Sequence, residues 1–179
     1  MYVAVKGFSL IEVLVALVIL TIGLIGIFNL HLVAKQGSYE SFQQTQAAYI
    51  AHDMVNRIKL NSSELKNYYG TFTGKVSDPP HSCDTSVPCT PRQIKTWDLY
   101  QLQNQLVGVS EKKGTANVGG LDSAVACIGP DANNILNIVL TWRGIRKLSD
   151  GATNQNAFVK ACGTKSDRRR VFSLQTVIL

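Results

Sequence analysis

The feature that most constrains this chain is an apolar run from Phe8 to Phe28, in which only Ser9, Glu12 and Thr21 are polar. As a helix this run rises about 31 Å, close to the thickness of the hydrocarbon core of a bilayer. A cleaved secretory signal does not explain it, because such a signal has a shorter apolar region that ends in a small-residue cleavage site. The run therefore predicts one membrane-spanning helix at residues 8–28.

The remaining residues, 29–179, leave room for one globular head, and the helical pattern continues into it. Apolar and polar side chains there fall on opposite faces of a helix, so this half of the helix is amphipathic and is expected to pack on the head. It should end near Asn61–Ser63, where short polar side chains compete for backbone hydrogen bonds. The residues of its apolar face are Ala47, Ile50, Ala51, Met54, Val55 and Ile58.

A second helix is predicted after a segment rich in glycine, serine, proline and threonine, Gly70–Pro91, which is expected to be a loop. Thr90 fits the N-cap, Pro91 the first helical position, and Gln93 the closing residue of a capping box. Gly108 suits the end of this helix.

Three strands are predicted in the rest of the chain. Apolar and polar residues alternate from Leu136 to Arg143, which is typical of a half-buried strand. Phe172–Ile178 shows a similar alternation, and Ala124–Ile128 is a shorter candidate. Strands gathered after the helices predict an α+β fold with an antiparallel sheet.

Four cysteines, Cys83, Cys89, Cys127 and Cys162, lie downstream of the apolar run and suit two disulfides in an oxidising compartment. We favour the pairs Cys83–Cys89, which closes a short loop before the second helix, and Cys127–Cys162, which ties one strand to the approach of the last. Zinc is the alternative, with His81 near Cys83, but five residues between Cys83 and Cys89 miss the usual zinc-ligand spacing. We therefore expect no metal and no cofactor.

The net charge of +6 and a pI near 9.2 would suit an anionic partner such as nucleic acid or lipid headgroups. The charges are mostly scattered, and only Arg168, Arg169 and Arg170 form a run, which is typical of a solvated loop. We expect no direct binding of nucleic acid.

No catalytic constellation is evident. The only histidines are His31, His52 and His81, and the nucleophile-elbow, zinc-protease and Walker-type glycine patterns are absent. The sequence therefore favours a protein that is not an enzyme and has no catalytic residues.

The distinctive chemistry lies at the entrance to the apolar run, where Lys6 and Gly7 precede Phe8 and a single carboxylate follows at Glu12. A lone acid in a membrane segment costs about 2.5–3.5 kcal/mol on insertion scales and usually has a partner. Residues 6–20, KGFSLIEVLVALVIL, resemble the type IV prepilin signature.

This resemblance implies that a prepilin peptidase on the cytoplasmic side cuts between Gly7 and Phe8, removes the leader Met1–Gly7, and methylates the new amine of Phe8. Residues 8–28 would then form both the membrane span and a helix of the fibre core. Glu12, one helical turn from that amine, would supply the assembly charge.

Further segments are similar to the PilV minor pilins. This resemblance implies the type IV pilin fold and a minor pilin that helps to initiate the fibre near its tip, in support of twitching motility, adhesion or DNA uptake. Its implied partners are other minor pilins, the major pilin and the inner-membrane assembly platform, and before assembly it would span the inner membrane once with a periplasmic head. The segments are residues 48–57 with Asn61, the pair Cys83 and Cys89 before Trp97-Asp98, residues 140–144, and residues 170–179.

Two alternatives remain open. A minor pseudopilin of a type II secretion system shares the leader but usually lacks this cysteine pattern. A bitopic anchor that carries a periplasmic binding domain would explain the span and the head, but it leaves Gly7, Phe8 and Glu12 without a reason.

Overall fold

The computed structural model describes residues 7, 9–74, 77–79, 81–83, 88–130 and 135–178. By its internal contacts the chain divides into two units, Met1–Tyr39 and Glu40–Leu179. The first unit holds the whole apolar run, and the second holds the head.

The long helix α1 extends from Leu10 to Leu60 and changes character along its length. In the first unit its large apolar side chains are exposed, whereas in the second unit one stripe is buried. The helix ends at Leu60 and a 3-10 helix, η1 (Ser62–Tyr68), follows, which confirms the expected end near Asn61–Ser63. The buried residues of the stripe are Gln43, Ala47, Ile50, Ala51, Met54, Val55 and Ile58.

The head contains a four-stranded antiparallel sheet with the strand order β1-β4-β5-β6. This sheet behind a long helix confirms the predicted α+β class and is consistent with the type IV pilin fold. Two further short strands, β2 and β3, pair only with each other in a hairpin. The bounds are β1 Gly70–Thr73, β2 Lys112–Lys113, β3 Ala116–Asn117, β4 Val125–Pro130, β5 Leu136–Arg143 and β6 Arg169–Thr176.

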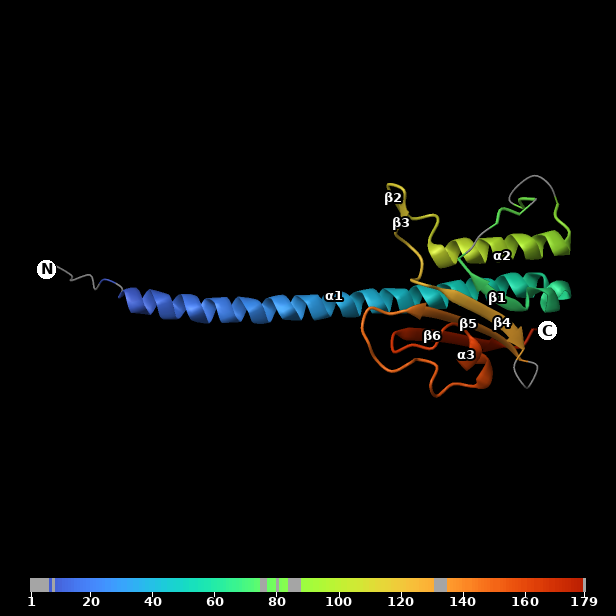
Figure 1. Ribbon diagram of the computed structural model, residues 1–179. Coiled ribbons are helices and arrows are strands. Elements are labelled where there is room, and N and C mark those ends of the chain that lie inside the picture. The colour runs from blue at the N-terminus through green and yellow to red at the C-terminus, as the bar shows by residue number, and fades with distance from the viewer. Residues whose placement is uncertain are drawn as a thin grey trace. The chain divides into compact units, whose positions relative to one another are not determined.

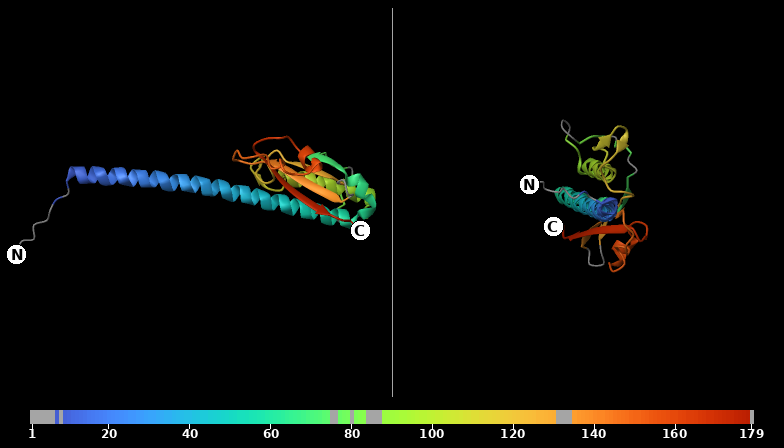
Figure 2. Two further views of the ribbon diagram at one scale, coloured as in Figure 1. Left: turned by 90° about the horizontal axis from the view of Figure 1, so that it is seen from below. Right: turned by 90° about the vertical axis from the view of Figure 1, so that its left-hand side faces the viewer.

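Within the head, the C-terminal half of α1 lies between the sheet and helix α2 (Pro91–Val107), as the views in Figures 1 and 2 show. Ile50, Met54 and Ile58 of α1 enter the core together with Ile138 and Leu140 of β5. Each such side chain stabilises the fold by about 1.5–3 kcal/mol when it is fully buried. This packing fixes α1 in the head from Glu40 onward.

The predicted capping of α2 is confirmed. Thr90 Oγ1 accepts a hydrogen bond from the backbone N–H of Gln93 at 3.4 Å, and Gln93 Oε1 accepts one from the backbone N–H of Thr90 at 2.8 Å. Pro91 is the first helical residue. Gly108 adopts a φ of 63°, a left-handed conformation that glycine takes without strain, and ends the helix.

Two predictions about the strands are wrong. Gly70–Thr73, expected to be loop, forms β1 because its backbone pairs with the edge of β4, and four residues carry no periodic signal of their own. Strand β5, expected to be half-buried, is buried on both faces up to Trp142. Its second face is covered by the segment after it, in which Ala152 and Val159 pack on Val139. That segment contains the short helix α3 (Ala157–Ala161).

Candidate functional site

Gly7, the residue before the predicted cut, is exposed, and a Cβ atom added to it would meet nothing within 4 Å. Neither a tight contact nor an unusual backbone angle therefore requires glycine at this position. Lys6 and Phe8, the other residues of the predicted processing site, lie outside the described residues.

The first turn of α1 holds the carboxylate. The carbonyl oxygen of Ser9 accepts hydrogen bonds from the N–H groups of Glu12 (3.1 Å) and Val13 (3.3 Å), so the helix begins immediately after the predicted processing site. A negative side chain is favoured in this turn because the helix dipole is positive there. Glu12 is exposed and forms no ion pair with any residue in the described ranges. Its carboxylate is therefore available to a cation from outside the described part of the chain.

The apolar side chains on either side of Glu12 and beyond it have no cover among the residues that the structure describes. The large ones from Leu10 to Val33 are between 47% and 81% exposed. By length and composition α1 could cross a membrane, since its most apolar 18-residue window has a mean hydropathy of 2.8. A surface of this size needs lipid or other apolar helices around it.

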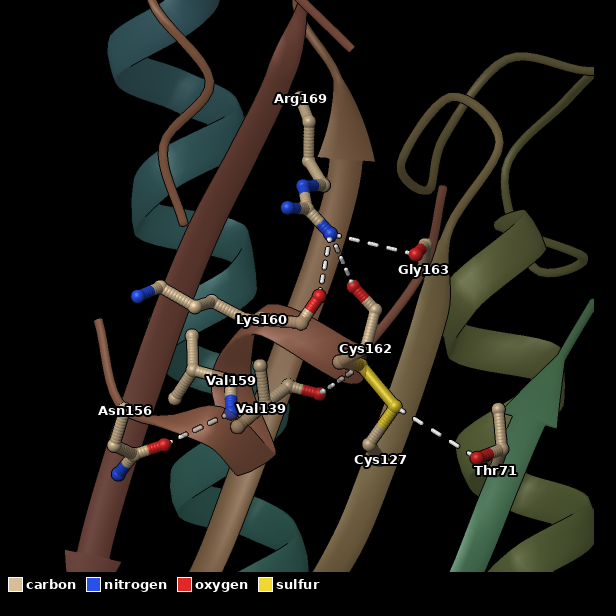
Figure 3. Close-up of a disulfide and its surroundings, with 9 residues drawn as sticks. All are labelled: Thr71, Cys127, Val139, Asn156, Val159, Lys160, Cys162, Gly163 and Arg169. Atoms are coloured by element: carbon tan, nitrogen blue, oxygen red, sulfur yellow. Dashed lines mark hydrogen bonds between the residues drawn. A yellow bond between two sulfur atoms is a disulfide. The ribbon is translucent and has the colours of Figure 1, made fainter. Parts of the chain in front are cut away.

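Both favoured cysteine pairs are present in the structure, as Cys83–Cys89 and Cys127–Cys162. The second pair joins Cys127 of β4 to Cys162, the residue after α3. It lies on the face of the sheet that the segment after β5 covers. Figure 3 shows how the Arg169 side chain secures this region, because its Nη1 donates to the carbonyl oxygens of Lys160 (3.2 Å), Cys162 (2.9 Å) and Gly163 (3.3 Å).

Arg169 also forms a buried ion pair, in which its Nε lies 2.9 Å from Asp150 Oδ1. Only 6% of the arginine side chain and 8% of the aspartate side chain are exposed. Burial raises the pKa of Asp150, but hydrogen bonds from Arg169 and from the backbone N–H groups of Ala152 and Ser166 outweigh it. The pKa of this carboxyl therefore lies below its usual range.

A second polar cluster joins α1, η1 and α2. Arg57 bridges Asp53 (2.8 Å) and Asp98 (3.1 Å), and the hydroxyl of Tyr68 donates to Asp98 at 2.7 Å while accepting from the Asn61 side chain. Burial and the hydrogen bond to Asp98 raise the pKa of Tyr68 well above its ordinary range. Each member has its partners inside the fold, so the cluster holds the three elements together and presents no reactive group.

Glu40, at the start of the compact head, is a site residue that the sequence reasoning missed. It accepts hydrogen bonds from the Arg146 backbone N–H (3.0 Å) and Nη2 (3.1 Å) and from Arg170 Nη2 (3.3 Å). Burial raises the pKa of Glu40, but these bonds and the two positive charges lower it overall. The partners are 106 and 130 residues away in the chain, so no local pattern could have revealed them.

We find no arrangement of catalytic side chains in the described ranges. No group of three or more histidine, cysteine, aspartate or glutamate residues is placed to hold a metal ion there. A groove of about 360 Å³ between α1 and α2 is bordered by Phe42 and Tyr49, and Glu111 is the one carboxylate among its lining residues. No histidine, cysteine or lysine is among those residues.

Residues 4–28 match the family described as "Prokaryotic N-terminal methylation motif". The match covers residues 4–7 of the predicted leader, the predicted processing site, Glu12 and the apolar run, and it indicates a type IV pilin-like or pseudopilin protein. Such a motif implies processing by a prepilin peptidase and assembly with pilus components, and with the apolar helix it suggests anchoring in the inner membrane. No curated protein and no solved structure matched the chain.

Proposed function

We propose that this chain is a minor pilin of a type IV pilus. It is cut between Gly7 and Phe8, methylated on the Phe8 amine, and held by residues 8–28 in the inner membrane with its head in the periplasm. It then joins other minor pilins and the major pilin at the inner-membrane assembly platform, helps to initiate the fibre and stays near its tip. There it supports twitching motility, adhesion or DNA uptake, and it performs no catalytic step.

The observation that carries this proposal is that the segment after the predicted processing site has a carboxylate and many apolar side chains that the described part of the chain neither pairs nor covers. Glu12 has no ion partner among the described residues, and the apolar side chains from Leu10 to Val33 are exposed. A bilayer covers such side chains, but it leaves the carboxylate uncompensated. A fibre supplies both requirements, because neighbouring subunits provide apolar helices and the charged amine of Phe8.

Two disulfides in the head support the PilV-like assignment within this class. Cys83–Cys89 lies just before the capped helix α2, and Cys127–Cys162 fastens the segment that covers β5. Disulfides of this kind persist in an oxidising compartment, which agrees with a periplasmic head. The runner-up is a minor pseudopilin of a type II secretion system, which the matched motif fits equally well.

Deletion of the gene in the source bacterium, with complementation by the intact chain, separates the two roles. We expect fewer surface pili and weaker twitching with normal secretion of exoproteins. The protein should also be present in sheared pili at a small fraction of the major subunit. Normal pili combined with lost secretion would instead assign the chain to the secretion system.

A further inference from the structure

The head has a small polar pocket on the face of the sheet that the segment after β5 covers. Its volume is about 140 Å³, and at about 10–15 Å³ for each water this space corresponds to about ten waters. It adjoins the region drawn in Figure 3, because Arg169 and Thr164, the residue after Gly163, are among its lining residues. The polar and charged side chains that line it, all in the head, are Ser123, Thr141, Arg143, Thr164, Ser166 and Arg169.

Thr141 of β5 gives the clearest indication that this pocket holds a ligand. Only 2% of the residue is exposed, and its hydroxyl group forms no hydrogen bond with any described residue. Buried hydroxyl groups nearly always have a partner, and a partner can reach this one from the pocket that Thr141 lines. Glycine is required at position 163, because a Cβ atom there would overlap the Thr141 hydroxyl oxygen. The fold therefore keeps a buried hydrogen-bonding group open to a bound molecule.

Two further hydroxyl groups of the pocket have hydrogens to donate. Ser166 Oγ accepts a hydrogen bond from the backbone N–H of Arg168 (3.0 Å), so its own O–H is not needed for that bond. Neither this O–H nor that of Thr164 donates to a described residue. Thr141, Thr164 and Ser166 can thus donate to one molecule in the pocket at the same time. A ligand that accepts several hydrogen bonds fits this arrangement.

The pocket also has a cation that can turn to a ligand. Arg143 Nε lies 2.8 Å from Asp122 Oδ2, but 58% of the arginine side chain is exposed, and such exposed pairs exchange readily with other partners. Arg169 is different, because its charge is balanced by the buried carboxylate of Asp150. No carboxylate is among the described residues that line the pocket. The lining therefore offers hydrogen-bond donors and a positive charge, which favours an anion.

The segment that forms most of the pocket carries the positive surplus of the whole chain, although the charges look scattered along the sequence. Residues 143–170 contain eight of the 18 basic and two of the 12 acidic residues, so this segment alone has a net charge equal to the +6 of the chain. Elsewhere the charges balance. A local surplus of this kind raises the concentration of anions near the pocket.

We propose that this pocket binds a phosphate group, with the three hydroxyl groups and the Arg143 guanidinium donating to its oxygens. A phosphate monoester carries a charge of about −1.5 to −2 on three strong acceptor oxygens, whereas a carboxylate carries one charge on two oxygens. The number of donors and the surplus of positive charge therefore favour phosphate. The pocket is larger than one phosphate ion, so it also has room for the first atoms of an ester. This inference concerns the head alone and goes beyond the proposed role in assembly.

The test is isothermal titration calorimetry of the full-length protein in a neutral detergent, at constant ionic strength, with inorganic phosphate, glycerophosphate and glycerol. We expect both phosphates to bind at one site and glycerol to give no binding. Thr141→Val and Arg143→Gln should each weaken phosphate binding about tenfold or more, because each removes a hydrogen bond to a charged group. The matched control Lys147→Gln removes a charge that is 71% exposed and lies outside the pocket, and it should have little effect.

Urea midpoints of the variants ensure that lost binding is not lost folding, and Arg143→Gln, at an exposed side chain, keeps the test decisive if Thr141→Val alters the fold. Tighter binding of glycerophosphate than of inorganic phosphate would support an ester as the ligand, and the reverse order would support the free ion. No binding of either phosphate at millimolar concentration would overturn the proposal. Equal weakening by Arg143→Gln and Lys147→Gln would also overturn it, because the general surface charge would then explain the binding.

Discussion

Glu12 and Asp150 are two carboxylates with opposite roles. Asp150 is enclosed by an arginine and two backbone N–H groups, so the fold itself explains its presence. Glu12 is exposed in the first turn of α1 and has no ion partner in the described part of the chain. Asp150 therefore serves folding, and Glu12 is free to serve assembly.

Loss of the Glu12 carboxylate should impair assembly and spare the fold. The Phe8 amine would then enter the fibre without a compensating charge, at a cost of several kcal/mol. We expect Glu12→Ala and Glu12→Gln to be inserted and disulfide-bonded normally, to be poorly recovered in sheared pili, and to reduce twitching. Immunoblots of sheared and cell-bound fractions measure this, with Glu111→Ala as the control at an exposed glutamate of the head. Normal recovery of Glu12→Ala at normal protein level would show that the carboxylate is dispensable.

Loss of the Asp150 charge should do the reverse and weaken the head. Asp150→Asn leaves Arg169 buried without a counter-charge, so the free energy of unfolding should fall by about 3–5 kcal/mol. Asp167→Asn, at an ion pair whose side chains are 71% and 54% exposed, is the matched control and should change little. Urea denaturation of both variants measures the difference, and equal stabilities would contradict the assigned role.

The same carboxyl should make the wild-type head acid-sensitive. Because the pKa of Asp150 is lowered in the folded state, its contribution is complete above the ordinary aspartate pKa of about 4 and is lost as the pH falls through the lower, folded value. Urea midpoints should therefore decline below about pH 4, and part of this decline should be absent in Asp150→Asn. An identical decline in the variant would assign the acid sensitivity to other groups.

At the scale of elements, the Cys127–Cys162 bond should stabilise the head more than Cys83–Cys89. The two bonds span 35 and 6 residues, and chain-entropy arithmetic gives roughly 3.8 and 2.4 kcal/mol. We expect the double variant Cys127→Ala/Cys162→Ala to unfold at clearly lower urea concentration than Cys83→Ala/Cys89→Ala. The opposite order would contradict the loop-length argument. It would indicate that the Cys83–Cys89 bond stabilises the head by more than the closure of its short loop.

Sequence reasoning succeeded for elements whose signals are local. Helix α2 is defined by Thr90, Gln93 and Gly108, which act within a turn of its ends. The end of α1 was also predicted at the right place, but Asn61 makes no side-chain capping hydrogen bond there and donates instead to Tyr68 Oη and the carbonyl oxygen of Pro91. Sequence reasoning failed for β1 and for the burial of β5, because both depend on segments far away in the chain that pair with or cover them. The contacts of Glu40 with Arg146 and Arg170 could not be predicted for the same reason.

The whole molecule consists of two units with different requirements. The head, from Glu40, completes its own core, its disulfides and most of its ion pairs. The N-terminal unit leaves its carboxylate and its apolar surface without cover among the described residues. The proposed pilus subunit, first held in a membrane and then built into a fibre, would satisfy both units, and the proposed cleavage after Gly7 would be the step that makes the second state possible.

Intact-mass and N-terminal peptide analysis of the mature protein from membranes tests that step directly. The account predicts a chain that begins at N-methylated Phe8 and lacks residues 1–7, with the leader retained when the prepilin peptidase is absent. A mature protein that retains Met1 in the presence of the peptidase, or one that is cut near Asn29 after the apolar run, would contradict it.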